Sequence, residues 1–481
     1  MAHQNDPHDR FESPLVGRYA SAEMSRIFSN RHRYGLWRDL WIALAEAEME
    51  LGLPIEESQI AEMRAHRDPI DFDRVSEIER EVRHETIAHL RTYGEACPKA
   101  KPILHLGATS AYVMDNSDLL QMREAIGLTI SKVVNAIEAL ADFAREHRDR
   151  ACLGYTHFQV AQPTTVGKRA CLWIQDLLLD LHELERRLEE LPFRGVKGTT
   201  GTQASFLHLF DGDHEKVREL DRRVAEKMGF SSSIPVAGQT YTRKIDVQVA
   251  HALAEVAQSA SKFAGDIRLL AGFREIEEPF QDKQVGSSAM AYKRNPMRCE
   301  RINALARTVL VGAQNLLHTA SVQWLERSLD DSTNRRVAIP ELFLAVDIVL
   351  NTWIEVARGL HVNGRVIEKR LADELPFIAT ENILMEAVHA GGDRQELHER
   401  IRVHSHEAAR SVKSGGSNDL IGRLSDDSGF EPIRDRFDEI LDPVRFVGRA
   451  PEQVDELLSE HVAPVLSRYR DRLGFKAETR V

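Results

Sequence analysis

The segment with the clearest capacity for chemistry is residues 286–296, which read GSSAMAYKRNP. Its small residues favour a flexible loop with free backbone N–H groups. The cation Lys293, the amide of Asn295 and a proline that can open a helix follow them. Such a loop can enclose an oxyanion. Composition alone favours the other interpretation, a solvated surface loop in which Lys and Arg are incidental.

Several standard catalytic motifs do not occur in the sequence. There is no GxSxG elbow, no GxxxxGK[ST] loop and no GxGxxG turn, so serine hydrolases, kinases and Rossmann enzymes lose support. His84 and His89 resemble a zinc-binding pair, but they lie five residues apart in the sequence. On a helix that spacing turns the two rings about 140° from each other, so one ion would not bind both easily.

The composition bears on compartment and partners. The chain has 63 Lys and Arg against 75 Asp and Glu, and its net charge of −12 disfavours nucleic acid and anionic membranes. We expect no membrane span, because no run approaches 18 apolar residues, and no signal peptide in the polar residues 1–9. We also expect no disulfide and a cytoplasmic location, because four cysteines form no cluster. They are Cys97, Cys152, Cys171 and Cys299.

Long helices must position the candidate residues. In residues 168–190, six apolar side chains share one stripe, whereas Asp180 and Arg187 are among the polar residues expected on other faces. Stripes of this length predict an all-α protein with an elongated bundle. The predicted long helices cover residues 117–147, 168–190, 242–275, 296–323 and 339–359.

Short polar stretches separate the predicted helices, and we expect them to form turns and helix N-termini with free N–H groups, and to carry the function. They are residues 104–118, 154–165, 195–206, 279–296 and 330–336. A chain of 481 residues exceeds one ordinary core. We therefore predict three domains: a helical N-terminal domain, a central long-helix bundle and a helical C-terminal domain. Their predicted ranges are residues 1–111, 112–362 and 363–481.

Residues 286–296 resemble the GSSxMPxKxN loop of the fumarase/aspartase superfamily, with Ala291 where the family has proline. The extension to residue 298 is similar to the branch that acts on succinylated purine ribonucleotides. Further segments resemble family blocks in the family's order, with Val160 where proline is usual. They are residues 105–110, 156–165, 195–203 and 239–244. The resemblance implies a three-domain, all-α fumarase/aspartase-like fold and a homotetramer whose sites each use three subunits.

The resemblance also implies a reaction. Members of this superfamily remove a proton beside a carboxylate and then break a C–N or C–O bond to release fumarate, so we expect a carbon–nitrogen lyase without cofactor. Preorganised donors must stabilise the carbanion as an aci-carboxylate. By resemblance, Ser287 is the general base, His157 is the general acid, Lys293 stabilises the dianion and His84 supports the acid. A serine needs N–H dipoles and a cation to act as a base, and imidazole holds a proton near neutral pH.

Other residues match family positions that bind substrate. Those that would hold phosphate and ribose are Arg18, Tyr19, Arg327, Ser332 and Arg336. Those that would hold the succinyl carboxylates are Thr109, Ser110, Thr156, Gln239, Lys293 and Asn295, with Arg301 nearby. Arg83, His84 and Glu85 match a block that orients the substrate, and Glu85 stands where the family usually has Asp. For most arginines of the chain, a solvated helix-face charge is the better interpretation.

We therefore expect small purine nucleotides as substrates, a homotetramer, and no nucleic acid, membrane or metal partner. Argininosuccinate lyase or another lyase of the superfamily is the near alternative, with the same loop and acid but different leaving-group contacts. Residues 292–294 and 327–336 favour the purine branch. A catalytically silent helical scaffold is the alternative from another class, and the presence of both Ser287 and His157 speaks against it.

Overall fold

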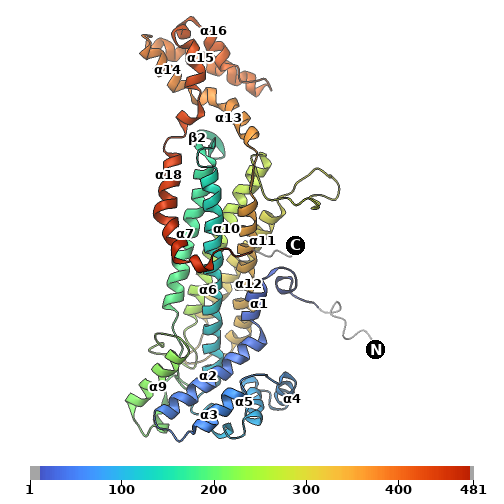
Figure 1. Ribbon diagram of the computed structural model, residues 1–481, viewed down its shortest axis with the longest axis vertical. Helices are drawn as coiled ribbons and strands as arrows, with labels where there is room; N and C mark the ends of the chain where they lie inside the picture. The colour runs from blue at the N-terminus through green and yellow to red at the C-terminus, as the bar shows by residue number, and fades with distance from the viewer. Residues whose placement is uncertain (1–10, 477–481) are drawn as a thin grey trace.

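The computed structural model describes residues 11–476, so the prediction about residues 1–9 lies outside the described part. The molecule is elongated, and long helices run side by side along its middle (Figure 1). The few strands are short and form two separate two-stranded sheets. The predicted all-α class is therefore confirmed, whereas the three domain boundaries stay a prediction.

Five long helices form the bundle, and all five were predicted from the sequence. Helix α10 packs against α11 and α7, α6 packs against α7, and α12 packs against α11 and α6. Their bounds are α6 (Ser110–Glu146), α7 (Val166–Glu190), α10 (Lys244–Gly272), α11 (Met297–Ser321) and α12 (Asp330–Gly359).

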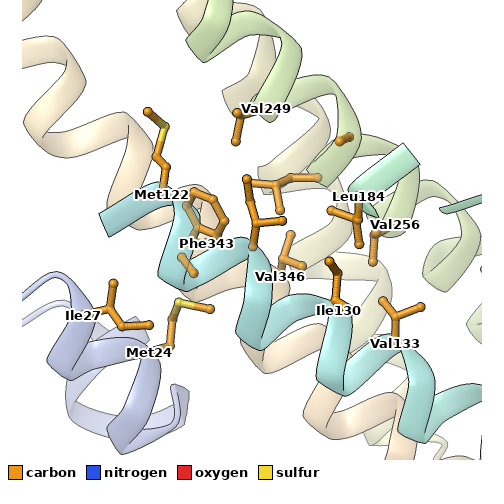
Figure 2. Packing of buried hydrophobic residues seen from close by; sticks show 14 of the residues in the cluster. Met24, Ile27, Met122, Ile130, Val133, Leu184, Val249, Val256, Phe343 and Val346 are labelled. Carbon is orange, nitrogen blue, oxygen red and sulfur yellow. The ribbon is translucent and has the colours of Figure 1, made fainter. Parts of the chain in front are cut away.

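The bundle is held together by apolar side chains that meet between these helices (Figure 2). Ile130 from α6, Leu184 from α7, Val256 from α10 and Val346 from α12 are almost completely buried. Burying a side chain of this size contributes roughly 1.5 to 3 kcal/mol. The bundle is thus a continuous core that can hold polar groups rigidly at both of its ends.

Smaller helices lie at the two ends of the bundle and along its sides (Figure 1). Those that precede or join its long helices are α1 (Ala22–Ile27), α2 (Asn30–Glu50), α3 (Glu57–Ala65), α4 (Phe72–Val82), α5 (Glu85–Ala96), α8 (Ala204–Leu209) and α9 (His214–Lys227). Those that follow it are α13 (Gly364–Ile378), α14 (Thr380–His389), α15 (Arg394–Lys413), α16 (Leu420–Asp426), α17 (Phe437–Ile440), α18 (Ala450–Leu457) and α19 (Ala463–Arg468). A second hydrophobic cluster, within residues 379–440, belongs to the latter group.

The strands pair in antiparallel fashion, β1 with β2 and β3 with β4. Their bounds are β1 (Ala151–Thr156), β2 (Gln159–Thr165), β3 (Ile276–Glu277) and β4 (His361–Val362). Short 3₁₀ or π-helical turns occupy Leu15–Tyr19 (η2), Lys101–Ile103, Ser428–Arg436, Pro443–Phe446, Leu458–Val462 and Arg470–Arg472.

Two of the predicted polar stretches are helix N-termini, as expected, and one forms paired strands instead of a turn. Residues 330–336 and 110–118 are helical, at the starts of α12 and α6. Both stretches carry buried polar side chains that interrupt an apolar stripe: Asp331 and Asp115 form ion pairs with Arg243 inside the protein. Most of residues 154–165 belongs to β1 and β2, because that stretch pairs with itself as a hairpin.

The polar side of α7 was also predicted incorrectly in part. The apolar stripe is buried as expected, but Asp180 and Arg187 are buried too. The reason is that α7 packs on both α6 and α10, so more than one face of the helix is covered. Arg187 forms ion pairs with Glu183 and Glu190 in this environment.

One helix, α12, is long and apolar enough to cross a membrane, but 83% of its most apolar window is buried inside the protein. That burial is typical of the core helix of a bundle. The four cysteines are buried free thiols, as the sequence predicted.

Candidate active site

A pocket of about 480 Å³ lies at the end of the bundle where α6 and α12 begin. Its walls come from the α4–α5 junction, the first residues of α6, the segment before α10 and the start of α12. It brings together nine residues that the sequence predicted for the site: Arg83, His84, Glu85, Thr109, Ser110, Gln239, Arg327, Ser332 and Arg336. These residues come from four distant parts of the chain.

Three helix N-termini converge on this pocket. Helix α5 begins at Glu85, α6 begins at Ser110, and Ser332 lies in the first turn of α12. The first N–H groups of a helix have no partner within it and carry a partial positive charge, so they attract carboxylate and phosphate groups. Together with the arginines in its walls, the pocket suits an anionic ligand.

His84 is the N-cap of α5, and its Nδ1 accepts the backbone N–H of Ile87 at 3.4 Å. That bond leaves the proton of a neutral ring on Nε2. His89 is instead buried, with its ring stacked on Tyr34. The two histidines therefore face different surroundings, as their spacing predicted, and among residues 11–476 no group of three His, Cys, Asp or Glu side chains is arranged to hold a metal ion.

A buried ion network lies under the pocket and fixes Arg327. Its Nη1 donates to Oδ1 of Asp331 at 3.1 Å, and Asp331 also accepts from Nε of Arg243 at 2.6 Å. Arg243 in turn donates to Asp115, which lines the pocket. Burial alone would raise the pKa of Asp115, but the charges of Arg243 and Arg335 outweigh it and hold that pKa below its ordinary value. Asp115 therefore stays ionised beside Arg243, and the ion pair with Asp331 gives Arg327 a fixed place.

Another arginine of the pocket, Arg336, donates through Nη2 to Oε2 of Glu85. The hydroxyl of Tyr34 donates to the other oxygen of that carboxylate at 2.7 Å. The sequence predicted that Glu85 orients the substrate. The structure shows that it also contacts Arg336, a residue predicted to bind the phosphate.

The loop that carries Ser287 lies between β3 and α11 and projects from the side of the bundle (Figure 1). The Oγ of Ser287 accepts the backbone N–H groups of Met290 at 3.2 Å and Ala289 at 3.4 Å. Asn295 closes the loop by donating to the carbonyl of Gly286 at 2.7 Å. Lys293 is exposed. Two of the N–H dipoles that a serine alkoxide needs are thus already present.

Gly286 has a specific reason to be glycine. A Cβ at this position would lie 2.1 Å from the carbonyl oxygen of Lys293, closer than any side chain tolerates. The two ends of the loop therefore meet only because this residue has no side chain.

Arg18, Tyr19 and Arg301 form a separate cluster near the start of α11. The guanidinium of Arg301 lies 5.0 Å from the centre of the Tyr19 ring, and that of Arg18 lies 5.5 Å from it. Contacts of this kind hold the cations by cation–π attraction. The cluster contains no residue of the 480 Å³ pocket.

His157 lies at the tip of the β1–β2 hairpin, next to Thr156. Thr156 pairs with Gln159, so His157 and Phe158 form a two-residue turn, with φ of 52° and 58°. Positive φ at both positions is the geometry of a type I′ turn, which usually contains Asn or Gly. The ring of Phe158 stacks on Phe273, with centroids 5.7 Å apart, and this contact helps to offset the backbone strain.

Within one chain, these groups lie far from one another. The pocket is at the first residue of α6, whereas the hairpin follows its last residue, and a helix of 37 residues spans roughly 55 Å. Helix α11, with 25 residues, similarly separates the Ser287 loop from the pocket by roughly 37 Å. Figure 1 shows β2 and the projecting loop in the upper half and α5 at the lower end. A single chain does not bring the predicted acid and base to the pocket.

The sequence did not identify every residue that shapes the site. Asp115, Asp331, Arg243 and Tyr34 hold pocket residues in place, yet none was predicted as a site residue. Asp331 had a local signal, because it follows its partner Arg327 by four residues. Tyr34 had none, since its partner Glu85 is 51 residues away.

Comparison with known proteins supports a single family. A lyase family model matches residues 17–311, and a model of the adenylosuccinate lyase C-terminus matches residues 376–457. The chain is 52% identical over 471 residues to adenylosuccinate lyase of Saccharomyces cerevisiae, which covers 97% of this chain and 98% of that protein. It is 48% identical over 475 residues to adenylosuccinate lyase of Schistosoma mansoni, covering 98% and 99% of the two chains.

Solved structures agree with the fold. A fumarate lyase from Mesorhizobium sp. BNC1 superposes with a TM-score of 0.77 at 25% identity, over 93% of this chain and 100% of that one. The 3-carboxy-cis,cis-muconate lactonizing enzyme from Pseudomonas putida also has a TM-score of 0.77, at 24% identity and over 94% and 98% of the two chains, which shows the fold alone. The full-length matches and the C-terminal family model show that the chain belongs to the adenylosuccinate lyase family.

Proposed function

We propose that this protein eliminates fumarate from adenylosuccinate, giving AMP, and from the succinylated aminoimidazole carboxamide ribotide, giving AICAR, in purine nucleotide biosynthesis. The observation that carries the proposal is the 480 Å³ pocket, in which helix N-termini, arginines and hydroxyls converge. A phosphate and two carboxylates are the groups that such a pocket stabilises. The near full-length similarity to adenylosuccinate lyases supports this choice among succinyl lyases.

In the proposed reaction, Ser287 removes the proton from the succinyl carbon beside a carboxylate. The loop N–H groups, Lys293 and Asn295 stabilise the aci-carboxylate that forms. The electron pair then expels the purine nitrogen, which His157 protonates, and the C–N bond breaks to give fumarate. The N–H groups that contact the Oγ of Ser287 support its assignment as base. No cofactor is needed for these steps.

We further propose that the active unit is a homotetramer in which one site takes its pocket, its hairpin and its loop from three subunits. The distances of roughly 55 Å along α6 and 37 Å along α11 support this arrangement. Exposed large apolar side chains on the bundle helices also support it, because such surfaces are usually covered by a partner. They are Leu172, Leu179, Leu269, Val311 and Leu317. Sedimentation of the purified protein should give the mass of four subunits, and a fully active monomer would refute the shared site.

We also propose a cytoplasmic location. Four buried free thiols fit a reducing compartment. Labelling the native protein in cells and separating compartments would test this.

The direct test of the function mixes purified protein with adenylosuccinate and follows fumarate and AMP by chromatography. We expect both products in equal amounts, and loss of turnover in Ser287→Ala. Argininosuccinate serves as the second substrate in parallel. Cleavage of argininosuccinate alone would replace the proposal with the other branch, and no turnover of any succinyl substrate would favour the silent scaffold.

A further inference from the structure

Arg336 stands between two cavities. It lines the 480 Å³ pocket and also a smaller cavity of about 180 Å³ behind it. Each cavity offers a carboxylate, since Glu85 lines the first and Asp118 lines the second. In the structure Nη2 of Arg336 donates to Glu85. The side chain is 36% exposed and a guanidinium carries five N–H donors, so donors remain for a ligand in the pocket.

Tyr34 determines where Glu85 lies. Its hydroxyl donates to Oε1 of Glu85 at 2.7 Å. Its ring is fixed by stacking on His89, with centroids 3.9 Å apart, and by an edge contact with Trp37 at 5.0 Å. Such aromatic contacts leave the hydroxyl little freedom to move. The carboxylate of Glu85 is therefore anchored by a rigid group on one side and binds Arg336 on the other.

The charge states support this geometry. Burial, together with the charge of Glu85, raises the pKa of Tyr34, so its hydroxyl keeps the proton that it donates. Burial alone would raise the pKa of Glu85, but Arg336 and the Tyr34 hydroxyl outweigh it and hold that pKa below its ordinary value. The carboxylate stays charged and keeps its attraction for Arg336.

We propose that Tyr34 is a positioning residue for phosphate recognition: by anchoring Glu85, it keeps Arg336 in the active-site pocket. Asp118 is the competing carboxylate, and it already accepts from Arg33 at 2.6 Å and from Arg335 at 2.8 Å. Without the Tyr34 hydroxyl, Glu85 moves more freely. The side chain of Arg336 then populates two orientations, one in each cavity. This inference rests on the proposed function, in which Arg336 holds the nucleotide phosphate.

The test compares Tyr34→Phe with wild type in the full-length protein. AMP and adenosine differ only by the phosphate, so their affinities, measured by calorimetry, isolate phosphate recognition. We expect Tyr34→Phe to weaken the affinity for AMP about tenfold, which corresponds to the loss of one hydrogen bond to a charged group. The affinity for adenosine should stay unchanged. The KM for adenylosuccinate should rise by a similar factor while kcat stays within about twofold.

Tyr93→Phe is the matched control, because Tyr93 is a buried tyrosine on α5 whose hydroxyl donates to the carbonyl of Met63 at 2.6 Å. It should leave the ratio of AMP to adenosine affinity at the wild-type value. In an Arg336→Ala background, adding Tyr34→Phe should change nothing further, since the effect passes through Arg336. If Tyr34→Phe does not fold, Glu85→Gln provides the test, because it keeps the length of the side chain but removes the charge that binds Arg336, and it should show the same selective loss.

An unchanged affinity ratio in the folded variant, or a tenfold loss that persists without Arg336, would overturn the inference and leave the proposed function intact. Wild-type protein that neither binds AMP nor cleaves adenylosuccinate would instead overturn both.

Discussion

Two inactive variants of this protein should restore activity when their subunits mix. His84→Ala removes a pocket residue, and His157→Ala removes the proposed acid at the hairpin tip. Because roughly 55 Å of helix α6 separates pocket and hairpin in one chain, a site that uses both must take them from different subunits. A mixed tetramer can then contain sites in which both histidines are intact.

The expected recovery follows from the assortment of subunits. In an equal mixture, a given pocket has an intact His84 in half of the cases, and the hairpin that reaches it has an intact His157 in half of the cases. If subunits assort at random, about one quarter of all sites are complete. Turnover should therefore rise from near zero in each variant to about 25% of the wild-type value in the whole mixture. It should reach about 29% in tetramers that contain both variants, since about one eighth of all tetramers are homotetramers without a complete site.

The assay co-expresses the two variants with different tags, isolates tetramers that carry both tags, and measures fumarate release from adenylosuccinate. Mixing His157→Ala with the double variant His84→Ala/His157→Ala is the matched control, because no complete site forms in any arrangement. Tetramers with both tags but without recovered turnover would refute the shared site, and they would require a path that brings hairpin and pocket of one chain together.

Three further predictions follow from individual groups. In heavy water, His157→Ala should still exchange the succinyl proton while Ser287→Ala should not, if proton removal precedes departure of the purine; near-normal turnover of Ser287→Ala would mean another group is the base. Treatment with a chelator should leave turnover unchanged, and strict loss would contradict the cofactor-free mechanism. Burial raises the pKa of Asp180 to about 7, above its unfolded value, so its carboxyl weakens the fold as pH rises from about 4 to 7. Asp180→Asn should stabilise the protein at pH 8, by about 4 kcal/mol at most, and little at pH 4; an equal gain by denaturant unfolding at both pH values would contradict this.

The helices of the bundle were predictable because their burial is mostly apolar and periodic. Val166–Glu190 is an example, since Ile174, Leu177 and Leu181 mark its buried stripe in the sequence and are buried in the structure. The starts of α6 and α12 were not predictable in this way. There Asp115 and Asp331 take the places of apolar residues, and their burial is sustained by Arg243, more than 80 residues from either partner. Periodicity carries no information about such pairs.

Site residues that belong to a sequence motif could be predicted, whereas contacts between residues of different motifs could not. The sequence indicated Arg83, His84 and Glu85, and the structure brings them into one pocket with Arg327 and Arg336. It gave no sign that Glu85 and Arg336 contact each other, because contacts between helices depend on the packing of the whole bundle. The roles assigned to these residues in catalysis stay predictions.

The length of the helices also accounts for the form of the element that carries the proposed acid. In the proposed shared site, the group that reaches into the pocket of another subunit has to project beyond its own bundle, and a hairpin with a two-residue turn is a short element that does so. The turn holds His157 and Phe158 at positive φ, which non-glycine residues adopt only when their surroundings compensate. The stack of Phe158 and Tyr155 on Phe273 and the position of Arg370 over that same ring, 4.5 Å from its centre, provide this compensation. The strained tip is thus supported by the bundle through Phe273 and by α13 through Arg370, so His157 sits at the end of a fixed support within a single chain.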